Sequence, residues 1–207
     1  MAKASPLVEF TINQGTTFTT STTFHTLTTF FTMDSEQILA QLAEKMPGAV
    51  LSSEIARDGI LNIHTKREQI VEMLHLLRDD AQLGFNFLTT LCAIHYPENV
   101  GQELGVIYHL HNWQKNVRIR VKIFFPKDDA HAPTVTGLWP TANWMERQEY
   151  DFFGVIFTGH PDLRRILNVE DMEVFPLRKE YRLEDGTRTD KDDRFFGRDG
   201  HVGQSFE

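Results

Sequence analysis

Residues 117–125, with the sequence VRIRVKIFF, decide the fold of this protein. Apolar side chains alternate there with Arg118, Arg120 and Lys122, and strict alternation over nine residues predicts a β-strand with one buried face. The three cations then share the opposite face. A solvated face is the favoured interpretation, although such a row of cations is also suited to an acidic partner.

Further strands are expected on the N-terminal side of this one. Residues 85–95 and 105–111 are apolar stretches of strand length. Residues 49–55 and 60–64 flank Arg57-Asp58-Gly59, and Asp-Gly between short apolar runs is typical of a β-hairpin. The sequence therefore predicts a sheet of several strands around residues 117–125.

Helices are expected before and between these strands. Asp34 and Gln37 form a capping box ahead of an apolar stripe that ends at Pro47-Gly48, and Thr65 with Glu68 is interpreted as a second capping box. The two stripes consist of Ile38, Leu39, Leu42 and Met46, and of Ile70, Val71, Leu74 and Leu77. After the sheet, residues 143–153 read as a helix ended by Gly154, followed by an extended run at 155–157.

These elements predict an α+β protein, with a mixed β-sheet, helices packed on it and an extended C-terminal arm. The folded domain is expected over residues 34–181. Residues 1–33 form a leader that is rich in threonine and interspersed with phenylalanine, for which we expect flexibility or docking rather than a separate fold. Residues 182–207 are polar and glycine-rich, and we expect them to become ordered only on a partner.

Composition excludes several classes of function. The chain of 207 residues has a net charge of −8, which argues against general nucleic-acid binding. Its one cysteine, Cys92, cannot build an iron–sulfur or all-cysteine zinc site, and we expect it to be a buried structural thiol. No apolar run has membrane-spanning length and no targeting segment is evident, so we expect an intracellular protein.

One hypothesis of catalysis concerns histidine. His109 and His111 are two residues apart and would point to the same face of a strand, and His95 on the preceding strand would lie beside them. With Glu146 or Glu149 as a base, this set would give a free-standing metal-dependent hydrolase. No nucleophile elbow, glycine-rich phosphate loop or HExxH motif accompanies it.

The densest chemistry lies in residues 146–167, which combine ERQEYDFFG with GHPDLRRIL. Arg147 and Asp151 have the i, i+4 spacing of a helical ion pair, and Glu146 and Glu149 share a face on which they could act in acid–base chemistry if buried. A solvated helix with ordinary ion pairs is the simpler interpretation. The mixture of arginine and aromatic residues is instead typical of an interface centre.

This segment resembles the 30-kDa family (the C subunit) of respiratory complex I, the proton-pumping NADH:quinone oxidoreductase. The resemblance rests on ERQEYDFFG, GHPDLRRIL and PLRKEY at 176–181, with Gln148 where the family usually has a second glutamate. It extends more loosely to about Asp34, through residues 85–88 and 133–139. It does not include the leader, and it fades after Tyr181.

The resemblance implies a structural and assembly role without an independent catalytic site. It implies no flavin, cluster or metal on this chain, and FMN, iron–sulfur clusters and quinone elsewhere in the complex. The implied partners are other peripheral-arm subunits, above all the 49-kDa-type subunit, on the cytoplasmic side of the cell membrane. The residues implied to position loops and docking surfaces are Glu146, Arg147, Glu149, Tyr150, Asp151, Gly154, His160, Pro161, Asp162, Arg164, Arg165 and Arg178.

Two further alternatives stay open at the level of sequence. One is the equivalent subunit of a membrane-bound nickel–iron hydrogenase or a related quinone-linked complex, which shares this module. The other is an adaptor unrelated to respiration. The identity of the partner chains would discriminate among them.

Overall fold

The computed structural model describes residues 34–181, so the expected leader (1–33) and C-terminal arm (182–207) lie outside the described residues. The elements, in chain order, are α2 (Ser35–Lys45), β1 (Val50–Ile55), β2 (Leu61–Thr65), η1 (Arg67–Gln69), α3 (Ile70–Asp79), β3 (Phe87–His95), β4 (Leu104–Asn112), β5 (Val117–Phe125), η2 (Lys127–Asp129), β6 (His131–Pro133), α4 (Ala142–Phe153) and β7 (Ile156–Thr158).

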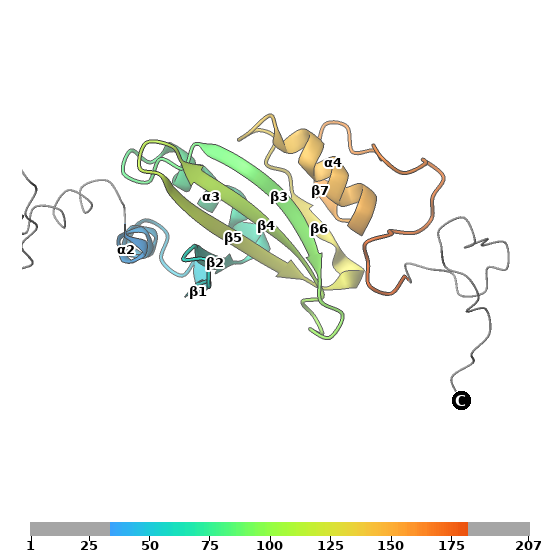
Figure 1. The fold of residues 1–207 in the computed structure, drawn as a ribbon, viewed down its shortest axis with the longest axis horizontal. Helices are drawn as coiled ribbons and strands as arrows, with labels where there is room; N and C mark the ends of the chain where they lie inside the picture. Colours follow the sequence, from blue (N-terminus) through green and yellow to red (C-terminus); the bar gives the residue numbers. More distant parts are fainter. Residues whose placement is uncertain (1–33, 182–207) are drawn as a thin grey trace, which may run out of the picture.

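A five-stranded sheet in the order β1-β2-β5-β4-β3 forms the centre of the domain (Figure 1). β2 and β5 are parallel, whereas the other neighbouring pairs are antiparallel. The mixed sheet with helices packed on it confirms the predicted fold class. The short β6 was not predicted, and it pairs in parallel with β7 in a second, two-stranded sheet.

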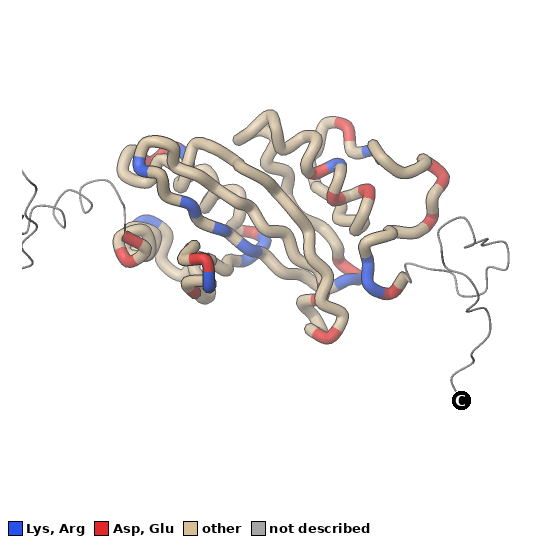
Figure 2. The backbone as a smooth tube through the Cα atoms, viewed as in Figure 1, with Lys and Arg blue, Asp and Glu red and all other residues tan. Residues whose placement is uncertain are grey.

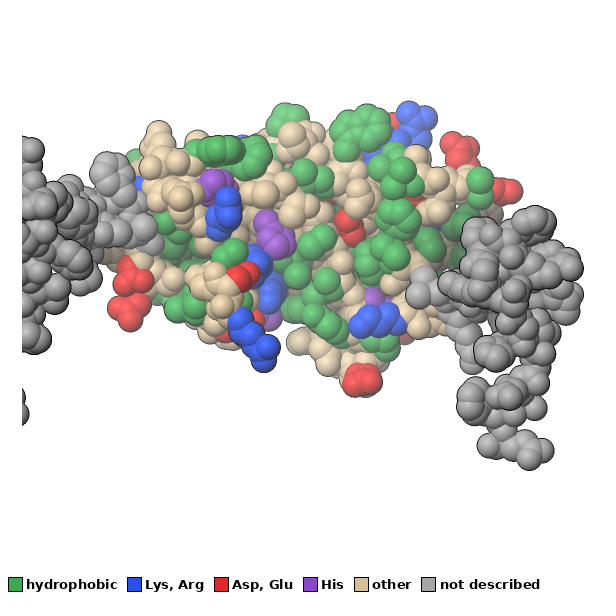
Figure 3. Space-filling model, in the orientation of Figure 1, with side chains coloured by type: hydrophobic (Ala, Val, Ile, Leu, Met, Phe, Trp, Pro, Cys, Tyr) green, Lys and Arg blue, Asp and Glu red, His purple; other side chains and the backbone are tan. Residues whose placement is uncertain are grey.

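The central strand β5 has the bounds and the two faces that its sequence predicts. Ile119, Val121 and Ile123 are at most 1% exposed. On the opposite face, Arg120 pairs with Asp58 and the Lys122 Nζ lies 3.3 Å from a carboxylate oxygen of Glu54. Figure 2 shows these cations as a row along β5, and Figure 3 shows the same face with basic and histidine side chains at its surface. β1 and the turn after it thus supply the counter-charges for Arg120 and Lys122.

Helices cover the other face of the sheet. The buried side chains of α2 are Ile38 and Leu42, and those of α3 are Ile70, Met73, Leu74 and Leu77. α3 lies behind the sheet in Figure 1, and in the described part of the chain no helix covers the front. The hydrophobic core therefore lies on one side of the sheet.

Of the predicted hairpin and the two predicted capping boxes, the hairpin and the first capping box are confirmed. The hairpin is present, with Gly59 at φ +77° in its turn, and so is the capping box of Asp34 and Gln37. The second capping box is wrong. Thr65 is the last residue of β2, and its hydroxyl donates to the Ala49 carbonyl at 2.8 Å. A short 3-10 turn lies between this strand and α3, so Thr65 is not at the start of a helix.

Gly105 in β4 leaves no room for a side chain. A Cβ at this position would lie 2.6 Å from the ring of Phe124 and 2.8 Å from the backbone oxygen of Ile123. The ring could rotate away, but the strand backbone cannot shift without disturbing the β4–β5 pairing.

We therefore expect Gly105→Ala to lower the free energy of unfolding by about 1–3 kcal/mol, the usual cost of overpacking. Gly137→Ala is the matched control, because nothing lies within 4 Å of its Cβ position. Urea denaturation of both full-length variants measures the difference. Equal stability of the two would contradict the close approach.

Candidate functional site

Helix α4 carries charged side chains that are buried. Glu146, Glu149 and Asp151 are at most 3% exposed, and Arg147 is 7% exposed. The simpler interpretation, a solvated helix with ordinary ion pairs, is therefore wrong for these four residues. Since a buried charge is costly unless it has partners, their partners reveal what the helix does.

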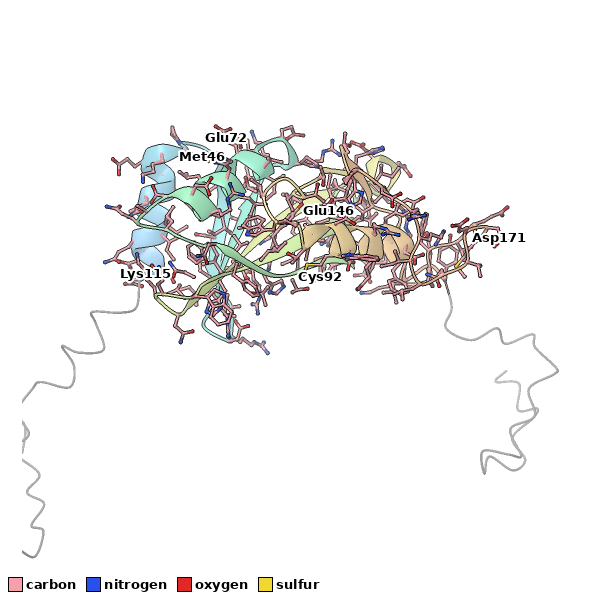
Figure 4. All side chains as sticks on the ribbon, turned by 90° about the horizontal axis from the view of Figure 1, so that it is seen from above. Met46, Glu72, Cys92, Lys115, Glu146 and Asp171 are labelled. Carbon is pink, nitrogen blue, oxygen red and sulfur yellow. The ribbon has the colours of Figure 1, made fainter. Side chains whose placement is uncertain are left out.

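Glu146 holds the segment that leads into α4. Its carboxylate accepts hydrogen bonds from the Thr134 hydroxyl at 2.6 Å and from the Val135 amide at 2.7 Å. Figure 4 labels Glu146 on α4. Burial raises the pKa of this carboxyl to about 7, although both hydrogen bonds favour the ionised form.

Glu149 binds an edge of the central sheet. Its carboxylate accepts a hydrogen bond from the Ala93 amide of β3 at 2.8 Å, and the Gln148 side chain lies 3.4 Å from its other oxygen. β3 is an outer strand of the sheet, and an unpaired edge amide is a site of unwanted strand pairing. Burial raises the pKa of Glu149 to about 7 as well.

Asp151 binds the segment that follows β7. Its carboxylate accepts hydrogen bonds from the amides of Ile166, Leu167 and Asn168 at 2.8–3.1 Å, and from the Asn168 side chain at 3.0 Å. Arg165 adds a charged hydrogen bond at 2.9 Å. Burial alone would raise the pKa of Asp151, but these hydrogen bonds outweigh it and hold the pKa well below its usual range.

The predicted ion pair between Arg147 and Asp151 is wrong, because the chain after β7 folds over this side of α4. Asp151 pairs with Arg165 instead. Arg147 donates from Nε to the Arg164 carbonyl at 3.2 Å and places its guanidinium 4.7 Å from the centre of the Trp144 ring.

Phe175 is a second centre of the site, and the sequence did not single it out. The guanidinium carbons of Arg165 and Arg178 lie 5.1 and 4.7 Å from its ring centre, and the Tyr150 ring is 6.5 Å away. Gly154 ends α4 at φ +72°, where a Cβ would come within 2.5 Å of Phe175. The glycine is needed for both the backbone conformation and the close approach.

Other residues of the motif complete the same region. His160 donates from Nε2 to the Asn143 carbonyl at 3.2 Å, and Arg178 donates from Nε to the Phe153 carbonyl at 2.6 Å. Pro161, Asp162 and Arg164 lie at the surface, where Arg164 and Asp162 form an exposed pair. The structure thus brings most of the predicted residues together as a bonded network between α4 and residues 159–178.

The histidine hypothesis is wrong. His95 pairs in register with Leu104 at one end of the β3–β4 hairpin, whereas His111 pairs with Phe87 at the other. His95 instead accepts a hydrogen bond from the Lys179 amide, and His109 lies 3.8 Å from Cys92. Within residues 34–181 no group of three histidine, cysteine, aspartate or glutamate residues is placed to hold a metal.

Cys92 lies on β3 near α4 and is half-buried (Figure 4). Burial, together with the charge of Glu149, raises the pKa of its thiol, which opposes nucleophilic reactivity. His109 Nδ1 accepts a hydrogen bond from Arg120, so its proton resides on Nε2 and faces the sulfur rather than withdrawing a proton from it. The pair is not arranged as a nucleophile and its base.

Over residues 34–181, none of the helices has both the length and the apolar character needed to cross a bilayer.

Comparison with known proteins adds a consistent result. A family model described as respiratory-chain NADH dehydrogenase, 30 kDa subunit, matches residues 63–187. The C subunit of the NADH-quinone oxidoreductase of Roseiflexus sp. (strain RS-1) is 42% identical over 153 residues, which is 73% of this chain and 86% of the relative. The corresponding protein of Acidothermus cellulolyticus, with the same name, is 42% identical over 145 residues, 70% and 75% of the two chains.

Two solved structures are also similar. The trypsin-resistant fragment of Nqo5 is 32% identical with a TM-score of 0.54, and the match covers 63% of this chain and all of the fragment. A chain of the membrane-bound sulfane sulfur reductase, an archaeal respiratory membrane complex, has a TM-score of 0.64 at 24% identity, over 82% and 95% of the two chains. This second likeness shows a shared fold.

Asp151→Ala removes the acceptor of four hydrogen bonds and leaves the buried Arg165 without its carboxylate. We expect a loss of about 3–5 kcal/mol in the free energy of unfolding, the range for breaking a buried ion pair. Asp162→Ala, in the exposed pair with Arg164, is the control and should change stability by no more than about 1 kcal/mol. Urea denaturation at pH 7 compares them, and similar losses in both would contradict the central place of Asp151.

The raised pKa values of Glu146 and Glu149 predict that the stability of the domain depends on pH. Their folded-state pKa values of about 7 lie above the ordinary 4.5, so their stabilising contribution is present below about pH 4.5 and is lost as the pH rises through 7. Ionisation of each group should lower the free energy of unfolding by roughly 3 kcal/mol between about pH 4.5 and pH 7.

Glu149→Gln cannot ionise, so we expect the decline in stability between pH 5 and pH 8 to be smaller in this variant by up to about 3 kcal/mol. Exposed Glu98→Gln is the control, which should leave the pH profile unchanged. Chemical denaturation at several pH values gives both profiles, and parallel profiles for Glu149→Gln and the parent chain would refute the assignment.

Proposed function

Because this chain belongs to the family of the respiratory-chain NADH dehydrogenase 30-kDa subunit, we propose that it is a structural and assembly subunit of the peripheral arm of proton-translocating NADH:quinone oxidoreductase, complex I. In this role it has no catalytic site of its own. The electrons pass from NADH through FMN and iron–sulfur centres to quinone on other subunits of the complex.

The observation that carries this proposal is how the carboxylates of α4 are used. Glu146, Glu149 and Asp151 all accept hydrogen bonds from backbone amides of other segments, and each is at most 3% exposed. A helix whose acids are engaged in this way organises the surface around it. We therefore assign the family motif a positioning role.

The surface that the motif positions is the segment 163–181. It contains neither helix nor strand, and it exposes Leu167, Val169, Val174 and Leu177 by 39–65%. Exposed apolar side chains held on a fixed backbone are typical of a docking surface. We propose that this segment, continued by residues 182–207, docks on partner subunits and above all on the 49-kDa-type subunit.

This assignment has consequences for cofactors and location. A single cysteine provides too few thiolates for an iron–sulfur cluster, which supports their place on other subunits. We propose that the chain is held on the cytoplasmic side of the cell membrane through the complex. Residues 34–181 then form the domain of the subunit, with residues 1–33 as a leader.

The alternative is the equivalent subunit of a hydrogenase-type complex. The chain of the archaeal sulfur reductase shares the fold, which supports this alternative at the level of the fold alone. The matches to two NADH-quinone oxidoreductase proteins at about 42% identity favour the first assignment.

The test is purification of a tagged chain from detergent-solubilised membranes of its own organism. We expect it to be recovered in a large complex with an NADH-oxidising flavoprotein, and we expect deletion of its gene to abolish NADH:quinone reduction. Recovery with a nickel–iron subunit would support the alternative. Recovery of the chain alone, with metal or hydrolase activity, would overturn the proposal.

The docking role of segment 163–181 has its own prediction. Val169→Asp with Leu177→Asp should reduce incorporation into the complex at least tenfold when the variant competes with the parent chain in the same cells, because charges would be buried at the interface. Differently tagged chains, quantified in the purified complex, give the ratio.

Val100→Asp is the control, since Val100 is 91% exposed in a loop between β3 and β4 and should be tolerated. The thermal stability of each isolated variant must equal that of the parent chain, so that a folding defect is excluded. Undiminished incorporation of the double variant would count against docking through this segment.

A further inference from the structure

An aromatic cluster that the motif does not explain lies where the first residue of β3 meets the β4–β5 hairpin, with two exposed rings over the buried His111. Trp113 is 63% exposed and Phe87 is 40% exposed, and their rings meet edge to face at 5.3 Å between centres. The ring of His111 lies 5.0 Å from that of Trp113. We call these three residues the Trp113 cluster. Tryptophan at such exposure is unusual on a free surface, and it is enriched among the residues that dominate binding energy at interfaces.

The hairpin holds this cluster in a fixed position. Asn112 is buried, donating to the Leu83 carbonyl at 2.7 Å and accepting from the Lys115 amide at 2.9 Å. Asn116 adopts φ +51° in the turn, and its side-chain oxygen lies 3.2 Å from Nε2 of His111. Binding through an anchor that is already ordered loses little conformational entropy.

The charges around the cluster indicate the chemistry of its partner. Arg118 is exposed and is the cross-strand neighbour of His111, so it lies on the same face of the sheet. Along this face Arg120 and Lys122 already have Asp58 and Glu54 as partners. Among residues 34–181 no carboxylate lies within 4.0 Å of Arg118, which leaves its charge available to a partner.

This surface is separate from segment 163–181. Figure 4 places Lys115, in the turn beside Trp113, at the opposite end of the domain from Asp171 of that segment. A partner seated on one surface would not cover the other. Two separated contacts increase the effective affinity of a subunit for an assembly without a change in either contact.

We propose that the Trp113 cluster and Arg118 form a second docking surface, which inserts Trp113 into an apolar socket bordered by aspartate or glutamate on a neighbouring subunit. This inference rests on the proposed function, since it requires an assembly. It adds a specific anchor and the chemistry of the surface that receives it.

Competitive incorporation tests the anchor. Trp113→Ala and Arg118→Glu should each be incorporated at least tenfold less than the parent chain, as expected for a hot-spot residue and for a reversed charge. Val100→Ala, an equally simple change at a more exposed apolar residue, should be incorporated normally. The isolated variants should keep the parent melting temperature, which excludes loss of folding as the cause.

A photo-crosslinking amino acid in place of Trp113, in the full chain within its complex, identifies what receives the anchor. We expect a cross-link to an apolar segment of another subunit that contains a carboxylate. Exchange of that carboxylate for lysine should then restore the incorporation of Arg118→Glu. Failure of this rescue, or a cross-link to residues 1–33 or to a second copy of this chain, would overturn the inference.

These experiments distinguish failure of the second docking surface from failure of the proposed function. Normal incorporation of Trp113→Ala and Arg118→Glu would remove the second surface while the subunit assignment stood. If the parent chain itself were absent from an NADH-oxidising complex, the assignment would fail, and the second surface with it.

Discussion

The burial of three carboxylates on one helix is the constraint on which the rest of the structure depends. Glu146, Glu149 and Asp151 lie within six residues of each other, yet they bind amides near residues 135, 93 and 167. Each would destabilise the core if its partner were absent, because an unpaired buried charge costs several kcal/mol. The position of α4 is therefore fixed relative to the sheet, to the segment that enters it and to the segment that leaves it.

The three acids reach opposite electrostatic states because they have different numbers and kinds of donor. Asp151 accepts from three amides, one side-chain amide and a guanidinium, and its pKa falls. Glu146 and Glu149 each have two neutral donors, which do not offset burial, and their pKa values rise to about 7. Near neutral pH the helix thus combines one firmly ionised anchor with two that are close to protonation.

Much of the fold could be predicted from local chemistry. The alternation of residues 117–125 correctly predicted a strand, and Gly59 and Gly154 correctly indicated positions of positive φ. The errors came from tertiary contacts that local spacing does not contain. Arg147 and Asp151 have ideal helical spacing, but a segment more than ten residues later supplies Arg165. The strand histidines were separated by a hairpin register that residue spacing cannot reveal.

The family motif and the proposed docking surface consist of largely different residues. Most charged side chains of the motif face inward and bind this chain's own backbone, whereas Leu167, Val169 and Leu177 face outward. A substitution in the first group is expected to act mainly on folding, whereas the proposed docking role predicts that one in the second acts mainly on assembly. Under the proposed function, the buried network builds the scaffold, and the exposed apolar side chains are the part of the segment that contacts a partner.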